Sequence, residues 1–343
     1  MKTYYPLLDA VRFFAAFWVM NFHYLLGLGL SNDLHWYRYG NLGVQLFFII
    51  SGFVIVQSLQ NKSFKEFTSG RFLRLFPLFW ICCTATYLLT LLVPGANNLE
   101  AFEYARSMTM VGDMFNEFFT FGRLIDPSYW TLAVELLFYA GIAIFTVLFS
   151  FKKIRYFLAS WLLLSTLAFV FNVNQDFYVK LALVSHASYF IFGGTLALIC
   201  SKQAKNIYEK YFDITLLFAS AFFATYIHPK ALPQYITQNL HDEKIVTILH
   251  IIFFISVLFL VYVSPLIKNT RSIKLFIILG GMTYPLYLLH QTIGNTLINY
   301  ATDILMISRN TFIVFFEIFI LLIAYIAYIQ DKKMRTWLQG KLR

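Results

Sequence analysis

Long apolar runs recur along the whole chain and constrain its fold more than any other feature of the sequence. An α-helix of roughly 17–25 apolar residues is long enough to cross the hydrocarbon core of a bilayer. About ten such runs follow one another in 343 residues, and turns or charged clusters separate them. Only 13% of the residues are charged, whereas soluble domains usually contain about a quarter. The sequence therefore predicts an all-α, polytopic membrane protein with about ten transmembrane helices.

The basic residues are distributed unevenly between alternate loops. Most of the 27 Lys and Arg residues fall in loops on the same side as the N-terminus. Because cytoplasmic loops carry an excess of Lys and Arg, both termini are predicted to be cytoplasmic. A net charge of +10 would suggest nucleic acid in a soluble protein, but here the charge follows the membrane topology, and we expect no nucleic-acid partner.

The first apolar run, Leu7 to Leu30, contains two ionisable side chains, Arg12 and His23. A spacing of eleven residues places them on nearly the same helix face, about 16 Å apart along the axis. An intramembrane ionisable residue is by default a candidate functional residue. The alternative is a snorkelling arginine and a histidine satisfied by a neighbouring helix. Asp9, three residues before Arg12, would pair with it on the same face.

Arg71 and Arg74 lie three residues apart, hence on one helix face, at the predicted cytoplasmic end of the third run. One interpretation is that they only follow the positive-inside rule or bind lipid phosphate. The other is that their guanidinium groups bind the phosphate ester of a ligand. In the preceding run, Ser51 and Gly52 are small enough to allow close helix approach, and packing alone would explain them.

The fourth apolar run opens at Pro127 and carries a carboxylate, Glu135, about two turns into apolar sequence. A buried carboxylate must be paired, protonated or in contact with water. Glu135 has no basic residue within one turn of its own helix, so its partner must come from elsewhere. Before this run, residues 94–127 predict short interfacial or re-entrant helices. The ninth run, Leu275 to Ile298, contains Pro285, which is predicted to break the helix.

Five segments in this order resemble the acyltransferase-3 family of membrane-bound O-acyltransferases. They are LDAVRFFAAFWVMNFHY, GVQLFFIISGFVI, RFLRLFP, SYWTLAVELLFY and TYPLYLLHQTI. The first matches a basic residue separated from a histidine by ten residues, and the last matches a Tyr-rich motif that ends in histidine. The positions that carry the resemblance, beside the supporting residue Asp9, are Arg12, His23, Ser51, Gly52, Arg71, Arg74, Glu135, Tyr284 and His290.

The resemblance implies one integral-membrane acyltransferase domain over residues 1–343, in a multi-pass plasma-membrane protein, here of a bacterial inner membrane. The donor would be cytoplasmic acyl-coenzyme A, most commonly acetyl-CoA, and the acceptor a hydroxyl of a cell-surface or lipid-linked carbohydrate. Many relatives carry an additional esterase-like soluble domain, whereas we expect no appended soluble domain here. The protein would therefore act alone, as a homo-oligomer, or with a separate glycan-assembly partner, in contact with membrane lipid.

This chemistry assigns roles to the polar residues. Arg12, Arg71 and Arg74 would hold the coenzyme A phosphates. A neutral imidazole at His23 would act as general base for direct transfer to the acceptor hydroxyl. The alternative is a covalent acyl-enzyme formed on His23 or on a nearby hydroxyl. Glu135 would orient His23 or bind acceptor hydroxyls.

Four aromatic residues near the predicted outer surface would contact a sugar or, alternatively, form an interfacial aromatic belt. They are Trp36, Tyr37, Tyr129 and Trp130. No spacing typical of metal ligands is evident, so no metal is predicted. Intramembrane Arg, His and Glu beside a Pro-broken helix would also suit a transporter or flippase for a lipid-linked sugar or anionic substrate. A structural or sensory membrane protein is a third alternative, and in it these polar residues would tolerate substitution.

Overall fold

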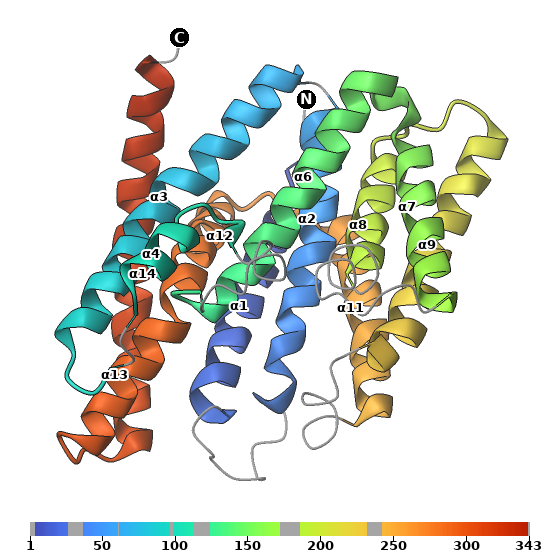
Figure 1. Cartoon of the computed structure of the whole chain (residues 1–343). Helices are drawn as coiled ribbons and strands as arrows, with labels where there is room; N and C mark the ends of the chain where they lie inside the picture. Colours follow the sequence, from blue (N-terminus) through green and yellow to red (C-terminus); the bar gives the residue numbers. More distant parts are fainter. Residues whose placement is uncertain are drawn as a thin grey trace. The chain divides into compact units, whose positions relative to one another are not determined.

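The computed structural model describes residues 4–26, 37–60, 62–96, 99–112, 124–171, 186–231 and 242–341. For residues 227–231 it describes the backbone alone. All regular elements in these ranges are helices (Figure 1). The predicted all-α class is therefore confirmed for this part of the chain. The longer helices are α1 (Pro6–Leu26), α2 (Gly43–Leu59), α3 (Phe64–Leu92), α6 (Trp130–Phe149), α7 (Ile154–Val170), α8 (Ala187–Cys200), α9 (Ile207–Ala231), α11 (Glu243–Val263), α12 (Thr270–Leu289), α13 (Gln291–Asp303) and α14 (Arg309–Lys341).

Short helices connect several of these elements. Among the described residues, four short 3-10 helices lie between or before the long helices: η1 (Tyr37–Leu42), η3 (Pro127–Tyr129), η4 (Phe151–Lys153) and η6 (Ser264–Leu266). Within the predicted interfacial segment, α4 (Ala101–Ser107) begins with a capping box, in which Glu100 and Glu103 each accept from the other's backbone N–H. The short helix expected in this segment is therefore present.

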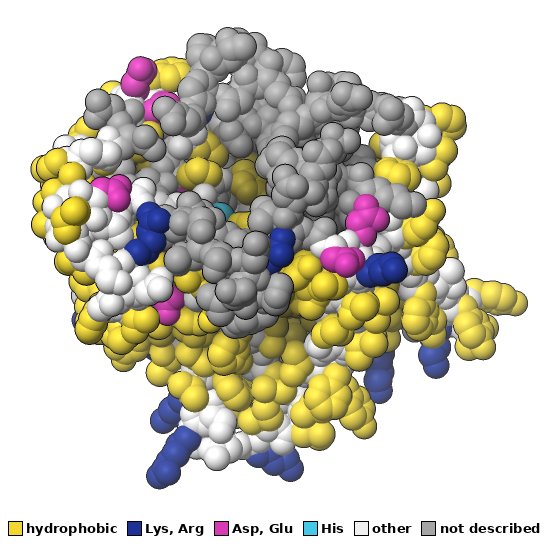
Figure 2. Space-filling view, turned by 90° about the horizontal axis from the view of Figure 1, so that it is seen from below, with side chains coloured by type: hydrophobic (Ala, Val, Ile, Leu, Met, Phe, Trp, Pro, Cys, Tyr) yellow, Lys and Arg dark blue, Asp and Glu magenta, His cyan; other side chains and the backbone are white. Residues whose placement is uncertain are grey.

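The protein is a multi-pass membrane protein. Seven of the described helical segments are long and apolar enough to cross a bilayer. Many large hydrophobic side chains on them are exposed, among them Leu92, Leu148 and Phe315. Figure 2 shows a broad area of hydrophobic side chains with few charged side chains within it. Such a surface suits lipid contact rather than water. The total of ten spans and the cytoplasmic position of the termini stay predictions.

The chain divides into two compact units, and each is described here by itself. The first unit comprises residues 1–41, 69–133 and 265–343. In it, α1 packs against α12 and α13, and both of these pack against α14. Figure 1 shows α13 and α14, in orange and red, beside each other. This unit contains most of the polar residues that the sequence singles out.

The second unit comprises residues 42–68 and 134–264, and its centre is the contact between α2 and α8. A Cβ added to Gly52 would lie 2.2 Å from the Phe190 carbonyl oxygen, and one added to Gly193 would lie 1.9 Å from that of Ile49. Both distances are far below van der Waals contact, so the two backbones touch only because these residues are glycines. The predicted close helix approach at Gly52 is confirmed.

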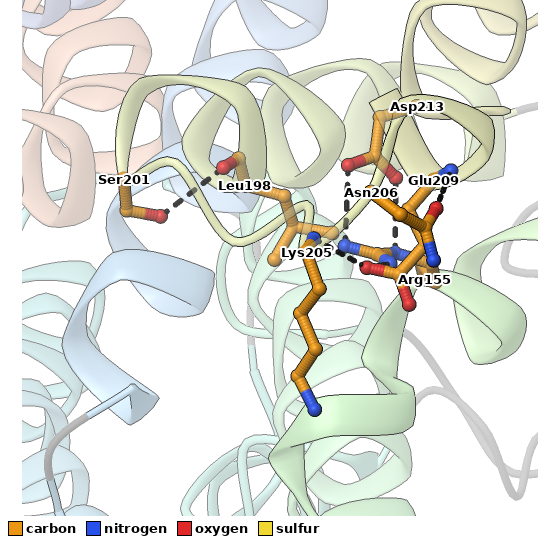
Figure 3. Close-up of polar contacts among 7 residues, drawn as sticks. All are labelled: Arg155, Leu198, Ser201, Lys205, Asn206, Glu209 and Asp213. Carbon is orange, nitrogen blue, oxygen red and sulfur yellow. Dashed lines mark hydrogen bonds and ion pairs between the residues drawn. The ribbon is translucent and has the colours of Figure 1, made fainter. Parts of the chain in front are cut away.

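A buried ion-pair cluster joins α7 to α9 in the same unit. The guanidinium of Arg155, 3% exposed, lies between the carboxylates of Asp213 and Glu209 (Figure 3). Its Nε is 3.2 Å from Asp213 Oδ1. The backbone N–H of Lys205 and the guanidinium of Arg155 both donate to Glu209 and lower the pKa of this half-buried carboxyl. The cluster fixes the start of α9 against α7.

Candidate functional site

The helix pair α12–α13 is interrupted at His290, and this break organises the candidate site. Pro285 was predicted to break the helix, but α12 continues through Pro285 to Leu289. The prediction was wrong because proline removes only one N–H donor and the packed neighbours of α12 hold the helix in place. The His290 carbonyl still accepts from the backbone N–H of Gly294, and side chains also donate to backbone carbonyls in this turn.

Two tyrosines donate to these carbonyls. The hydroxyl of Tyr24 on α1 donates to the carbonyl of His290 at 2.8 Å. The hydroxyl of Tyr129 in η3 donates to that of Leu288 at 3.2 Å. Tyr129, which the sequence placed near the outer surface as an acceptor contact, is only 2% exposed. In this structure its side chain supports the helix break.

The proton position on His290 follows from its own hydrogen bond. Its Nδ1 lies 2.7 Å from the carbonyl oxygen of Tyr287, and a carbonyl oxygen can only accept. Nδ1 therefore carries the proton, and in the neutral ring Nε2 carries the lone pair. Nε2 is buried and has no hydrogen-bond partner among the described residues. The break thus presents one basic nitrogen in a fixed orientation.

His23 lies beside this ring. It occupies the last turn of α1, and its ring centroid is 5.2 Å from that of His290, with the planes inclined at 45°. The sequence assigned His23 to catalysis and His290 only to a supporting motif. The structure brings the two imidazoles together, so two titratable nitrogen bases share one place in the first unit.

Asp126 is the residue of this site that the sequence analysis missed. It is fully buried, and its Oδ1 accepts from the backbone N–H and the hydroxyl of Ser128, at 2.9 and 2.6 Å. Its Oδ2 accepts from the backbone N–H of Thr292 at 2.9 Å. The carboxylate thus caps both η3 and the first turn of α13, directly after His290. The sequence Asp126-Pro127-Ser128 is a recognisable N-cap followed by proline, and this signal could have identified it.

Glu135 lies in the second unit and has two hydroxyl partners. Its Oε1 accepts from Ser51 Oγ on α2 at 2.6 Å and from the hydroxyl of Tyr139, one turn later on α6. The sequence required a partner from elsewhere, and Ser51 is that partner. Both hydroxyls therefore donate to the same carboxylate oxygen.

The predicted phosphate-binding arginines lie in the first unit. Arg12 is half-buried on α1, and Arg71 and Arg74 are half-buried on α3. Arg74 lines a pocket of about 520 Å³ together with Asp9, Tyr284 and residues of α14. The hydroxyl of Tyr4 donates to Asp9, and that of Tyr284 donates to the Leu75 carbonyl at 3.0 Å.

The remaining predicted contacts with the acceptor are only partly described. Trp36 lies outside the described residues, whereas Tyr37 begins η1 and Trp130 begins α6, both half-buried. The structure thus groups the predicted residues as His23 with His290, Ser51 with Glu135, and Asp9 with Arg74 and Tyr284.

Comparison with known proteins points to one kind of chemistry. The sequence profile of an acyltransferase domain matches residues 5–329. Nodulation protein 10 of Rhizobium leguminosarum bv. viciae is 28% identical over 229 residues, which cover 59% of this chain and 61% of that protein. O-acetyltransferase OatA of Staphylococcus aureus is 30% identical over 155 residues, 40% of this chain but only 24% of that protein. This chain therefore spans only part of the length of either relative. No solved structure matches it.

Proposed function

The chain belongs to the acyltransferase-3 family, and from that premise we propose that it transfers an acetyl group from acetyl-CoA to a hydroxyl of a cell-surface or lipid-linked carbohydrate. The printed name of the staphylococcal relative, an O-acetyltransferase, supports oxygen as the acceptor atom. The membrane-spanning character of the chain suits a donor on one side and an acceptor at or beyond the other.

The observation that carries the proposal is the pair of imidazoles of His23 and His290, held beside the buried carboxylate network of Asp126. Acyl transfer to a hydroxyl needs a base that removes the hydroxyl proton and an acid that returns it to the leaving thiolate. A histidine performs both steps near neutral pH, because its ordinary pKa is about 6.5.

Acetyl transfer from the thioester to the hydroxyl needs no further reactant. His23 takes the proton of the acceptor hydroxyl while that oxygen attacks the thioester carbonyl carbon. The carbon–sulfur bond then breaks, and the imidazolium returns its proton to the coenzyme A thiolate. His290, whose Nδ1 is held by the Tyr287 carbonyl, orients His23 or holds the proton between the two steps. A covalent acyl-histidine would use the same residues in two half-reactions.

The donor would enter at the end of the first unit where Arg74 lines a pocket. Arg12, Arg71 and Arg74 would bind its phosphates, because guanidinium groups match phosphate oxygens with several donors at once. Glu135, held by Ser51 and Tyr139, would bind acceptor hydroxyls or orient His23. Trp36, Tyr37 and Trp130 would provide aromatic faces for the sugar.

The test supplies the purified full-length protein in nanodiscs with acetyl-CoA labelled in the acetyl group and an extract of cell-surface glycans. We expect free thiol to appear in step with label on the glycan, and mass spectrometry of the glycan then identifies the product. Uptake of a lipid-linked sugar without thiol release would instead favour the transporter. Label that reaches no glycan, lipid or protein acceptor while thiol is released would indicate hydrolysis.

A further inference from the structure

The last described part of the chain contributes basic residues to the pocket beside Arg74. The apolar stretch of α14 ends near residue 330, and the helix continues to Lys341 with the sequence DKKMRTWLQGK. Lys332 and Arg335 of this continuation line the pocket. We infer that these two side chains complete the binding site for the phosphates of the acyl-CoA donor. The inference rests on the proposed function and adds a part of the chain that no motif of the sequence analysis included.

The charges in the pocket favour an anion. Three cations, Arg74, Lys332 and Arg335, face two carboxylates, Asp9 and Asp331. The Asp9 carboxylate accepts from the hydroxyl of Tyr4, which also lines the pocket. Among the described residues, neither Arg74 nor Lys332 forms an ion pair. Two basic side chains are therefore available to a ligand without breaking an existing ion pair.

Asp331 forms an ion pair with the third cation, Arg335. Its carboxylate, 7% exposed, lies 2.7 Å from Arg335 Nη2, one turn along the same helix. This ion pair restricts the guanidinium, so less side-chain entropy is lost when the remaining donors bind a phosphate. Asp331 is thus a positioning residue, and Arg335 is the residue expected to contact the ligand.

The size and walls of the pocket suit part of a nucleotide. A volume of about 520 Å³ lies within the range of small-molecule sites. Tyr4, Tyr284 and Tyr328 line it, and tyrosine faces are good partners for a purine ring. Glycines bring the wall close, because a Cβ on Gly281 would lie 2.2 Å from Tyr328 Cε2. A phosphorylated lipid headgroup shares the phosphate chemistry, and the experiment separates the two sources.

The experiment measures equilibrium binding of coenzyme A to the full-length protein in nanodiscs, before and after the double substitution Lys332→Ala with Arg335→Ala. The matched control is Lys333→Ala, the next residue on the same helix, which does not line the pocket. We expect the double variant to weaken binding by tenfold or more, roughly the factor that ~1.4 kcal/mol produces, and the control to bind as wild type. The conservative variant Lys332→Arg, with Arg335 intact, keeps both positive charges and should bind as wild type.

The outcomes distinguish the inference from the proposed function. If wild type binds coenzyme A and the double variant binds it equally well, the inference is overturned while the proposed donor stands. If wild type neither binds coenzyme A nor turns over acetyl-CoA, both are overturned. Native mass spectrometry measures the anionic lipid that stays bound to wild type and to the double variant. Loss of lipid from the double variant with unchanged coenzyme A affinity assigns the pocket to a headgroup and also overturns the inference.

Discussion

His23 on α1 and His290 at the α12–α13 break lie with their ring centroids 5.2 Å apart. The two residues come from opposite ends of the chain, and the packing of α1 against α12 and α13 brings them together. Tyr24, next to His23 in sequence, donates to the backbone carbonyl of His290, so the same helix turn that carries His23 also fixes the break. This pairing connects the fold of the first unit to its proposed chemistry.

Asp126 should be needed both for stability and for activity. The substitution Asp126→Ala removes a buried carboxylate that accepts three hydrogen bonds, two of them from backbone N–H groups. Hydrogen bonds to charged groups contribute about 1.5–3 kcal/mol each, so a loss of at least ~2 kcal/mol of unfolding free energy is expected. Thermal unfolding in detergent and the rate of thiol release measure the two effects.

Asp303→Ala is the control for this substitution. Asp303 ends the same helix, α13, but is exposed, and its removal should change neither quantity. Equal unfolding temperatures for Asp126→Ala and Asp303→Ala would show that the cap at the helix break does not stabilise the site.

Ser51 should act on the reaction through Glu135. Ser51→Ala removes the 2.6 Å hydrogen bond to Glu135 Oε1, and we expect kcat to fall about tenfold while KM for acetyl-CoA stays near wild type. Ser51→Thr keeps the hydroxyl and should restore most of the rate, which a purely packing role would not produce. Steady-state kinetics of the three proteins test this, and an unchanged kcat in Ser51→Ala would remove Glu135 positioning from the mechanism.

The contact between α2 and α8 should not tolerate a methyl group. Gly193→Ala would place Cβ 1.9 Å from the Ile49 carbonyl oxygen, and neither backbone can yield without separating the helices. We expect destabilisation of about 1–3 kcal/mol or more. Gly340→Ala is the matched control, because no atom lies within 4 Å of its added Cβ and alanine favours helix. Unfolding temperatures that fall equally in both variants would contradict the close approach.

The Arg155 cluster should show the cost of a buried charge without its partner. Arg155→Ala leaves the carboxylate of Asp213, 1% exposed, without its cation, and the expected loss is about 3–5 kcal/mol. Replacing Arg155 and Asp213 together by leucine should recover most of it. Thermal unfolding of both variants provides the test, and a double variant less stable than Arg155→Ala would contradict it.

Acid should weaken the ion pair between Arg155 and Glu209 in the same cluster. The lowered pKa of Glu209 means that its contribution is present above the unfolded value, about 4.5, and is lost as pH falls through the lower folded value. Glu209→Gln should therefore flatten the acid side of the stability curve. A wild-type curve that matches the Glu209→Gln curve throughout acid pH would exclude this contribution.

The sequence predicted most of the helices because span length and apolar composition depend on local residues. It also identified Gly52 as a place of close approach, since small residues in apolar helices have few other uses. Pro285 was misread because a proline signal reports the loss of one hydrogen bond and says nothing about the neighbours that hold the helix. The hydroxyls that donate to the carbonyls of Leu288 and His290 come from η3 and α1, and only the tertiary structure brings them there.

The candidate site was predictable only in part for the same reason. Arg12 and His23 are conspicuous because an ionisable side chain in an apolar run is costly. Asp126, Lys332 and Arg335 lie at helix ends, where polar residues are ordinary, and their importance follows from what they contact. The pairing of His23 with His290 and of Ser51 with Glu135 required the packing of helices far apart in sequence.

The measurement that tests the central claim most directly is the rate of acetyl transfer by His23→Ala, made at equal protein amount and with coenzyme A affinity measured in parallel. The account predicts that kcat falls by about 10²–10⁴, the usual contribution of a general base, while coenzyme A binds as tightly as to wild type. Near-normal transfer by His23→Ala would contradict the assignment of His23 as the base.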